Sequence, residues 1–213
     1  MGRRSKKLSK DEQQEVEEWI YQNNTEETRM TDTMTISVKC KTENQKSLVN
    51  SIKEKEVTIC SGPAGTGKTF LACAEALKLI KRHAKYKKIV IVKSVTTLKN
   101  EEIGFLKGNL REKMEPFMFS FVHNFEKLVG QAITSKLREL KTIEEMPIAY
   151  MRGINLDRSI IIVDEAQNIS QENMRTILTR LGKDSKMIFL GDERQQDSKG
   201  GNGLTFLMDH FSH

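Results

Sequence analysis

The sequence predicts an α/β fold: a mostly parallel sheet with helices on both faces. Three observations support this class. Short apolar runs recur along the chain, segments with apolar residues at helical spacing alternate with them, and a glycine-rich loop joins the first run to a helix. Strands buried on both faces read as continuous apolar runs, and their parallel connections need a crossover helix. The alternation of the two kinds of segment therefore favours one α/β domain.

The expected elements follow one another in a regular order. A helix precedes the first strand, and the glycine-rich loop leads into a helix with a basic last turn. A second strand is followed by a long mixed segment with helical patches and no strong strand. After the third strand comes a helix that Ser170 is expected to cap and Gly182 to end, and then a fourth strand. The ranges are 43–53, 56–61, 69–82, 88–92, 100–145, 159–165, 170–182 and 186–190.

Composition bounds the class of protein. The 213 residues carry a formal net charge of +6, but residues 1–10 hold five Lys and Arg and no acid, which leaves only +1 for the rest. We expect a flexible basic and acidic extension over 1–40 and one domain over 41–213. No apolar run reaches the roughly 18 residues of a membrane helix. The three cysteines form no C-x-x-C pair, so a cytoplasmic protein without disulfides, a zinc site or a membrane partner is expected.

The glycine-rich loop GPAGTGKT, residues 62–69, matches the phosphate-binding pattern G-x-x-x-x-G-K-[ST] at every fixed position. Its glycines permit backbone angles that turn N–H groups toward an anion, and the next helix adds its positive end. Lys68 is expected to reach the β- and γ-phosphates of a nucleotide, and Thr69 to ligate Mg²⁺. The alternative is a turn that binds nothing. The expected contacts are Gly62, Pro63, Ala64, Gly65, Thr66, Gly67, Lys68, Thr69 and Phe70.

Two other loops follow predicted strands and would reach the same edge of the sheet. Asp164 is expected to hold Mg²⁺ opposite Thr69, while Glu165 orients and polarises the attacking water. Gln195, in GDERQQD, is expected to sense the γ-phosphate. Ordinary loop side chains are the simpler alternative for these residues. No N-K-x-D guanine motif follows, so ATP is expected; Gln45 can pair with adenine, although by residue type alone it reads as a solvated side chain.

These residues and the segments around them resemble the PhoH family of ATPases. The resemblance covers roughly residues 42–208 and implies a P-loop NTPase with a single RecA-like core, related to superfamily 1 helicases. It also implies that Gln45 reads adenine. The family usually has Arg-Pro after the second strand, where this chain has Ser94-Val95. The matching stretches are NQKSLVNSI, GPAGTGKTFLA, EIGFLKGNLREKMEPF, AYMRG, IIIVDEAQN, LTRLG, SKMIFLGD-x-x-Q-x-D and NGL.

Such helicases use a second RecA-like domain to supply arginines across the cleft, and this resemblance implies that one core lacks part of the machinery. We therefore expect a ring-like homo-oligomer, for example a hexamer, with ATP at the subunit interfaces. The candidates for the arginine supplied in trans are Arg152, Arg175 and Arg180. Each of them also suits a surface ion pair or a helix-end contact.

RNA or single-stranded DNA is a further expected partner. The run KLIKRHAKYKK, residues 78–88, holds six Lys and Arg with Tyr86 among them, and residues 104–119 contain phenylalanines that can stack on bases. A solvated helix end and core packing are the alternatives. Two other functions stay open. They are a small-molecule kinase, for which no basic lid is evident, and a nucleotide-binding regulatory module, against which Glu165 argues.

Overall fold

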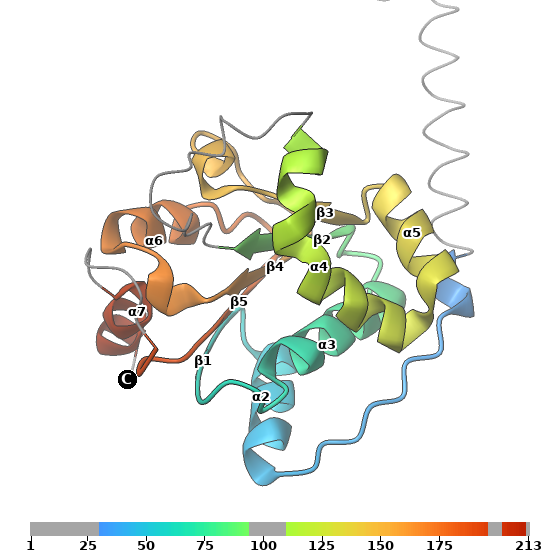
Figure 1. The fold of residues 1–213 in the computed structure, drawn as a ribbon, viewed down its shortest axis with the longest axis horizontal. Helices are drawn as coiled ribbons and strands as arrows, with labels where there is room; N and C mark the ends of the chain where they lie inside the picture. The colour runs from blue at the N-terminus through green and yellow to red at the C-terminus, as the bar shows by residue number, and fades with distance from the viewer. Residues whose placement is uncertain (1–29, 94–109, 196–201, 212–213) are drawn as a thin grey trace, which may run out of the picture.

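The computed structural model describes residues 30–93, 110–195 and 202–211, and over 110–117 it describes the backbone alone. Within these ranges the centre is a five-stranded sheet in the order β1-β5-β4-β2-β3, with every pairing parallel. The four predicted strands are all present, and the predicted α/β class is confirmed (Figure 1). The strands are β1 (Val57–Ser61), β2 (Lys88–Lys93), β3 (Ile143–Glu145), β4 (Ser159–Asp164) and β5 (Lys186–Gly191).

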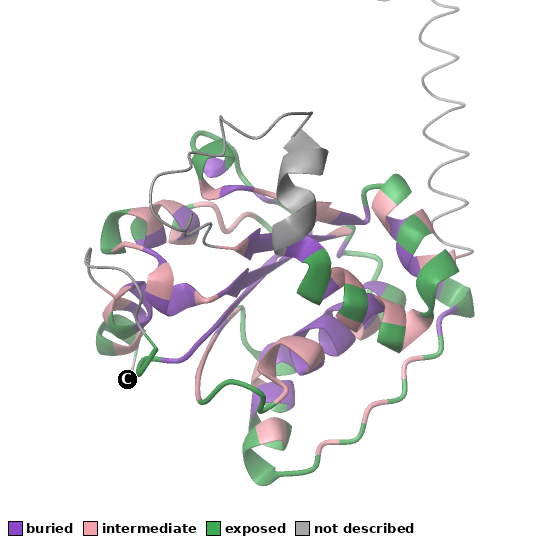
Figure 2. Ribbon diagram, viewed as in Figure 1, coloured by how far each residue is buried: buried purple, intermediate pink, exposed green. Residues whose placement is uncertain are grey.

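The two faces of the sheet pack against different helices, because successive residues of a strand point to opposite faces. On β2, Ile89 and Ile91 join a core with α2, α3, α4 and α5, whereas Val90 and Val92 join a core with α6 and α7. Figure 2 shows the buried residues along the strands and on the sheet-facing sides of the helices. The helices are α2 (Glu43–Glu54), α3 (Lys68–Arg82), α4 (Leu110–Val129), α5 (Gln131–Glu139), α6 (Gln171–Leu178) and α7 (Gly203–Phe211).

The strand β3 lies in the mixed segment 100–145, for which the sequence predicts no strong strand. It has three residues, Ile143–Glu145, and pairs with β2 at one side of the sheet. A strand this short, with two acidic residues after a single isoleucine, carries no readable alternation. The helical patches expected in the same segment correspond to α4 and α5.

The helix α6 begins as predicted but ends earlier. The Ser170 hydroxyl accepts a hydrogen bond from the backbone N–H of Asn173 at 3.3 Å, so the predicted cap is confirmed. The prediction that Gly182 ends the helix is wrong, because α6 ends at Leu178 and Leu181 then forms a bridge with Leu156. Close packing instead explains the glycine: a Cβ at Gly182 would lie 2.8 Å from the backbone nitrogen of Asp157.

The described part of the predicted N-terminal extension lies on the domain. Met34 is buried in the core on the α3 side, and Val38 and Cys40 pack against it. Lys81 of α3 donates hydrogen bonds to the backbone carbonyls of Asp32 (3.0 Å) and Met34 (2.6 Å). Among the described residues, no helix is both long and apolar enough to cross a bilayer.

Candidate functional site

The glycine-rich loop connects β1 to α3 at the carboxyl edge of the sheet. Gly65 has φ 75° and Gly67, which precedes α3, has φ 85°, so both occupy the left-handed region that favours glycine. Gly62 does not have a positive φ, so the backbone argument made for the loop applies to Gly65 and Gly67. The Thr66 hydroxyl donates a 2.9 Å hydrogen bond to the Pro63 carbonyl. An internal hydrogen bond therefore closes the loop, and the N-terminus of α3 points toward the cavity that the loop borders.

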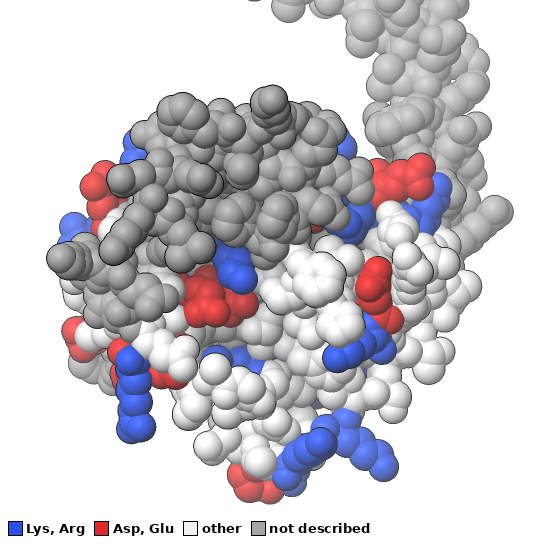
Figure 3. Space-filling view, viewed as in Figure 1, with Lys and Arg blue, Asp and Glu red and all other residues white. Residues whose placement is uncertain are grey.

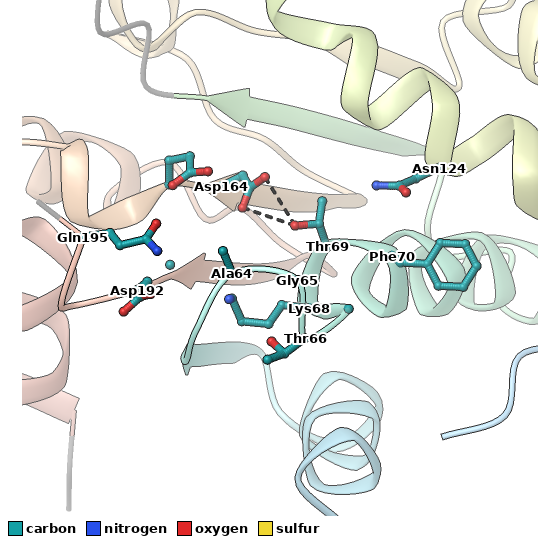
Figure 4. A pocket seen from close by; sticks show the side chains of 13 residues that line it. Ala64, Gly65, Thr66, Lys68, Thr69, Phe70, Asn124, Asp164, Asp192 and Gln195 are labelled. Carbon is teal, nitrogen blue, oxygen red and sulfur yellow. Dashed lines mark hydrogen bonds between the residues drawn. The ribbon is translucent and has the colours of Figure 1, made fainter. Parts of the chain in front are cut away.

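A cavity of about 290 Å³ lies between this loop and the ends of β4 and β5 (Figure 4). Besides the loop and first turn over 64–70, it is lined by Asn124, Asp164, Glu165, Gly191, Asp192 and Gln195. The structure thus brings together the predicted phosphate loop, the predicted metal ligands and the predicted catalytic side chains. Figure 3, drawn from the side of Figure 1, shows acidic side chains gathered near the middle of this face, with basic side chains beside them and around the margin.

Lys68 is folded back over the loop. Its ammonium group donates hydrogen bonds to the backbone carbonyls of Gly62 (2.6 Å) and Pro63 (2.8 Å). Among the described residues that line the cavity, Lys68 is the only cation. The ammonium is therefore held at the cavity wall by acceptors that an anionic ligand would replace.

Thr69 and Asp164 form the oxygen-rich part of the cavity. The Thr69 hydroxyl lies 3.4 Å from each carboxylate oxygen of Asp164, which is buried (Figure 4). Burial raises the pKa of the Asp164 carboxyl above its usual value, and the charge of Glu165 raises it further. Lys93, on the neighbouring strand β2, and the Thr69 hydroxyl act in the opposite direction. A cation between these oxygens would remove the main electrostatic penalty at this position.

This donor set fits Mg²⁺ better than a metal held by protein ligands alone. A hydroxyl and a carboxylate are the hard oxygen ligands that Mg²⁺ prefers, and Mg²⁺ commonly keeps waters and takes further oxygens from phosphates. The described residues contain no group of three or more His, Cys, Asp and Glu that could hold a metal. Thr69 and Asp164 therefore suit a metal that arrives with a phosphate ligand.

Glu165 stands in a strained backbone conformation directly after β4. Its φ of 53° lies in the left-handed region, which for a residue other than glycine costs on the order of 1 kcal/mol. The next residues form a single 3₁₀ turn, η3 (Ala166–Asn168). The carboxylate of Glu165 accepts a 2.7 Å hydrogen bond from the side-chain amide of Gln167. The backbone thus turns the Glu165 side chain to the cavity, and an amide holds it there.

Two residues at the site have no role in the sequence-based prediction. Gln167 lies in the stretch IIIVDEAQN, but an amide after two acids gives no sign of which groups it contacts. Asn124 lines the cavity from α4, far along the chain from the other residues. No local pattern marks Asn124, because the packing of α4 over the sheet is what brings it there.

Gln45 lies at a second cavity of about 620 Å³ on the other side of the loop. Its amide nitrogen donates to the Thr66 carbonyl at 3.0 Å, and its amide oxygen accepts from the backbone N–H of Lys41 at 2.7 Å. Apolar side chains, among them Leu48 and Phe70, share the lining with it. A partly apolar cavity next to a phosphate loop is suited to a nucleobase.

The three candidate arginines have different surroundings. The guanidinium of Arg175 lies over the Phe206 ring, 5.1 Å from its centre. Arg180 donates to the backbone carbonyl of Ile154 (3.2 Å) and to the hydroxyl of Thr179 (3.0 Å). The side chain of Arg152 is 67% exposed and that of its ion-pair partner Glu172 is 86% exposed, with 3.8 Å between the charged groups. Exposed pairs of this length hold a side chain weakly, so Arg152 is the most available of the three.

The two segments predicted to contact nucleic acid differ in how exposed their aromatic side chains are. In the run 78–88, Tyr86 is only 4% exposed, so its ring belongs to the core and cannot stack on a base. The run joins α3 to β2 at the amino edge of the sheet, opposite the glycine-rich loop.

In the run 104–119, residues 104–109 lie outside the described ranges, as do Ser94 and Val95. Phe119 is 73% exposed and stacks on His123, with the rings 7° from parallel.

The chain is similar in sequence to proteins of one family along most of its length. A family model described as PhoH-like protein matches residues 37–213. A PhoH-like protein of Bacillus subtilis (strain 168) is 39% identical over 165 residues, which is 78% of this chain and 51% of that protein. A PhoH-like protein of Synechocystis sp. is 39% identical over 160 residues, covering 75% and 48%. The protein PhoH of Escherichia coli (strain K12) is 31% identical over 181 residues, covering 83% and 51%. The chain spans about half the length of these curated relatives.

Proposed function

Because the chain belongs to the PhoH-like protein family, a family of P-loop nucleotide-binding proteins, we propose that it binds ATP with Mg²⁺ and hydrolyses it to ADP and phosphate. The observation that carries this proposal is the meeting of four features at one cavity. A phosphate-type loop with its lysine, a hydroxyl beside a buried carboxylate, a second acid in a strained conformation and an amide side chain all line it.

Binding is assigned to the loop and to the two cavities on either side of it. The polyphosphate lies along the backbone N–H groups between Gly62 and Thr69, and Lys68 exchanges its carbonyl partners for phosphate oxygens. The base lies in the second cavity, next to Gln45 and the apolar side chains there. Gln45 must open its contact with Lys41 or Thr66 to read the base, because both ends of its amide are engaged with the backbone.

Hydrolysis is assigned to the residues that face the γ-phosphate. Thr69 and Asp164 would hold Mg²⁺, which would supply charge neutralisation for the phosphate oxygens. Glu165 orients a water and accepts its proton while the bond from the water oxygen to the γ-phosphorus forms. The bond to the β,γ-bridging oxygen breaks, ADP leaves and the proton passes to solvent. Gln195 hydrogen-bonds the γ-phosphate and so distinguishes ATP from ADP.

The substitution Glu165→Gln tests hydrolysis directly. We expect phosphate release to fall by about 100-fold or more, since a positioned proton acceptor contributes of that order, while the affinity for ATP changes little. Glu139→Gln on α5, an exposed residue on another part of the surface, is the matched control. Unchanged phosphate release from Glu165→Gln would overturn the assignment. A wild-type chain that binds ATP but releases no phosphate would favour the alternative function, a nucleotide-binding regulatory module.

An arginine from a neighbouring copy is proposed to complete the site. The loop follows β1, at one edge of the sheet, whereas Arg152 follows the 3₁₀ helix η2 (Ile148–Met151) and lies 3.8 Å from Glu172 in the first turn of α6. Head-to-tail association would therefore bring Arg152 of one copy toward the loop of the next, and repetition of that contact gives a ring. We propose a homo-oligomer of this kind, with Arg152 as the arginine supplied in trans.

Mixing two defective variants tests this arrangement. Arg152→Ala keeps its own Glu165, and Glu165→Gln keeps its own Arg152, so a mixture contains some interfaces with both residues intact. We expect each variant alone to be nearly inactive and the mixture to recover activity. Arg175→Ala, whose guanidinium is held over Phe206, is the control and should retain its activity. Full activity of Arg152→Ala, or a mixture no better than its parts, would exclude Arg152 from this role.

Coupling to RNA or single-stranded nucleic acid is proposed through α4. The stacked pair of Phe119 and His123 is exposed next to Asn124, which lines the cavity. Stacking on an aromatic ring is worth about 1–3 kcal/mol per base. Phe119→Ala should therefore weaken salt-dependent RNA binding and reduce any RNA stimulation, with basal hydrolysis unchanged. Phe211→Ala, an exposed phenylalanine on α7, is the matched control. The absence of binding at low salt would remove this proposal.

A further inference from the structure

The side-chain amide of Gln167 joins the two loops that carry the hydrolytic residues. Gln167 is 1% exposed. Its nitrogen donates to the carboxylate of Glu165 at 2.7 Å, and its oxygen accepts from the backbone N–H of Asp192 at 3.1 Å. Glu165 follows β4 and Asp192 follows β5. One buried amide therefore links the ends of two adjacent strands at the cavity.

The orientation of this amide follows from its partners. The partner at Asp192 is a backbone N–H, which can only donate, so the amide oxygen must face it. The amide nitrogen is then left for Glu165, whose ionised carboxylate can only accept. Turning the amide over would set donor against donor and acceptor against acceptor. The amide nitrogen of Gln167 therefore always faces Glu165, and the amide oxygen always faces Asp192.

The close approach of β5 keeps this amide in place. A Cβ at Gly191 would lie 2.5 Å from the amide oxygen of Gln167, a distance that real contacts essentially never show. Glycine at 191 therefore allows the strand end to pass against Gln167. The backbone of Gly191 therefore leaves little space on that side of the Gln167 amide oxygen.

The same strand end also carries the residue assigned to the γ-phosphate. The carbonyl of Asp192 accepts a 3.0 Å hydrogen bond from the backbone N–H of Gln195, and its carboxylate accepts one of 3.0 Å from the N–H of Arg194. Asp192 is buried, and Gln195 lines the cavity. A continuous series of contacts thus runs from Gln195 through Asp192 and Gln167 to Glu165.

We propose that Gln167 is a positioning residue that couples the orientation of Glu165 to the loop after β5. The inference rests on the proposed hydrolysis of ATP. With the γ-phosphate in place, Gln195 and Asp192 hold the loop against Gln167, and the amide holds Glu165 toward the attacking water. When the phosphate leaves and the loop shifts, the N–H of Asp192 withdraws and the amide no longer holds Glu165. Gln167 itself does not touch the reacting atoms.

The substitution Gln167→Met keeps the length of the side chain and removes both hydrogen bonds. We expect kcat to fall by about tenfold or more while the ATP dissociation constant stays within about twofold, because only orientation is lost. Gln171→Met is the matched control, since Gln171 is exposed on α6 four positions along the same segment. It should match the wild type in both quantities.

A double-mutant cycle separates positioning from a general structural effect. If Gln167 acts through Glu165, Gln167→Met should cause no further loss in a Glu165→Gln chain, measured as slow release of labelled phosphate. Losses that multiply in the double variant would overturn the proposal. So would a kcat equal to that of the wild type, or a loss of ATP affinity that parallels the loss of rate.

A second variant covers the case in which Gln167→Met does not fold. Gln167→Glu keeps an oxygen for the N–H of Asp192 but cannot donate to Glu165 when ionised. We expect its kcat to fall by about tenfold or more, and a kcat like that of the wild type would overturn the proposal. A wild-type chain with no phosphate release would overturn the proposed function together with this inference. An active wild type with an equally active Gln167→Glu would overturn this inference alone.

Discussion

At the amino edge of the sheet, several polar side chains are paired with backbone groups of the fold. The Ser185 hydroxyl accepts from the backbone N–H of Ser159 at 2.9 Å and donates to the Leu156 carbonyl at 2.6 Å. The guanidinium of Arg158 donates to the backbone carbonyls of residues 84 and 85. Even Lys186, whose pKa is lowered by burial and by the neighbouring Lys85, donates to a backbone carbonyl of residue 55. These contacts join loops that meet below the strands.

The carboxyl edge of the same strands is arranged differently. Asp164 and Glu165 place two acids side by side at the cavity, and the charge of Glu165 raises the pKa of Asp164. Among the described residues, the Lys68 ammonium donates hydrogen bonds to the carbonyls of its own loop. Like charges at adjacent acids are destabilising in the empty protein. The difference teaches that one edge contributes to stability, while the other is organised for a ligand that brings the missing charges.

The largest effect is expected from Lys68→Ala. Removing the only cation among the described cavity residues should lower phosphate release by about 1000-fold or more, equivalent to roughly 4 kcal/mol of transition-state stabilisation. Thermal stability should change little, because the ammonium contacts only its own loop. The control is Lys183→Ala, an exposed lysine at the amino edge. If Lys68→Ala lost the fold and kept its rate per folded molecule, the contrast between the edges would be wrong.

At the amino edge, Gly182→Ala should lower stability and leave activity unchanged, the opposite of the result expected for Lys68→Ala. The new Cβ would lie 2.0 Å from the Asp157 carboxylate oxygen and 2.8 Å from the Asp157 nitrogen, so backbone must move. Overpacking of this kind costs about 1–3 kcal/mol, and a backbone clash belongs at the upper end of that range. Urea unfolding measures the loss, and kcat per folded molecule should equal that of the wild type. A stable chain with impaired kcat would reverse the assignment of the two edges.

Gly191→Ala makes the same chemical change at the carboxyl edge. Its Cβ would lie 2.5 Å from the amide oxygen of Gln167 and 2.9 Å from the Leu204 side chain, so side chains rather than backbone must shift. We expect a kcat lower by about tenfold, or roughly 1.4 kcal/mol, with a smaller loss of stability than Gly182→Ala shows. Steady-state kinetics and urea unfolding on both alanine variants make the comparison. A loss of stability equal to that of Gly182→Ala would remove the distinction.

The smallest effect concerns the stability of Asp164→Asn. Burial and Glu165 raise the pKa of Asp164 in the native state, so between the unfolded and native pKa values the native state binds more protons than the unfolded state. Stability of the wild type therefore falls as pH rises through that window. Asn carries no charge, so the variant should be more stable at neutral pH by roughly 1 kcal/mol, or about 2–4 °C. The advantage should vanish in acid below the unfolded pKa.

Thermal melts without Mg²⁺ and nucleotide measure this difference. Mg²⁺ with ATP should raise the melting temperature of the wild type and have little effect on Asp164→Asn. A variant that is less stable than the wild type at neutral pH would contradict the expected penalty of the buried charge.

The parts that were predictable from sequence are those with local signals. Continuous apolar runs mark the four long strands, and GPAGTGKT predicts the loop that follows β1. The acids after β4 fall at the same edge because parallel strands share a direction. The strand β3 is too short to show a period, and the end of α6 is set by the bridge of Leu181 with Leu156 rather than by a glycine.

The contacts of Gln167 and Asn124 depend on packing between distant segments. Nothing near either residue indicates its partner: Asn124 reaches the cavity through the position of α4, and Gln167 through the passage of β5 beside η3. The fold class and the glycine-rich loop can therefore be predicted from sequence, whereas the positions of Gln167 and Asn124 at the cavity are found only from the structure.

The folded-back lysine of the loop has a consequence for which ligands the site accepts. Any anion must compete with the carbonyls of Gly62 and Pro63, which already accept hydrogen bonds from the ammonium of Lys68. A single phosphate offers few contacts in return for opening that internal pairing, whereas a longer polyphosphate engages the loop and the helix end together. In the empty loop, the carbonyls of Gly62 and Pro63 thus compete with a ligand for the ammonium of Lys68. If the proposed nucleotide binding is correct, this internal pairing should favour a nucleoside triphosphate over a small anion such as inorganic phosphate.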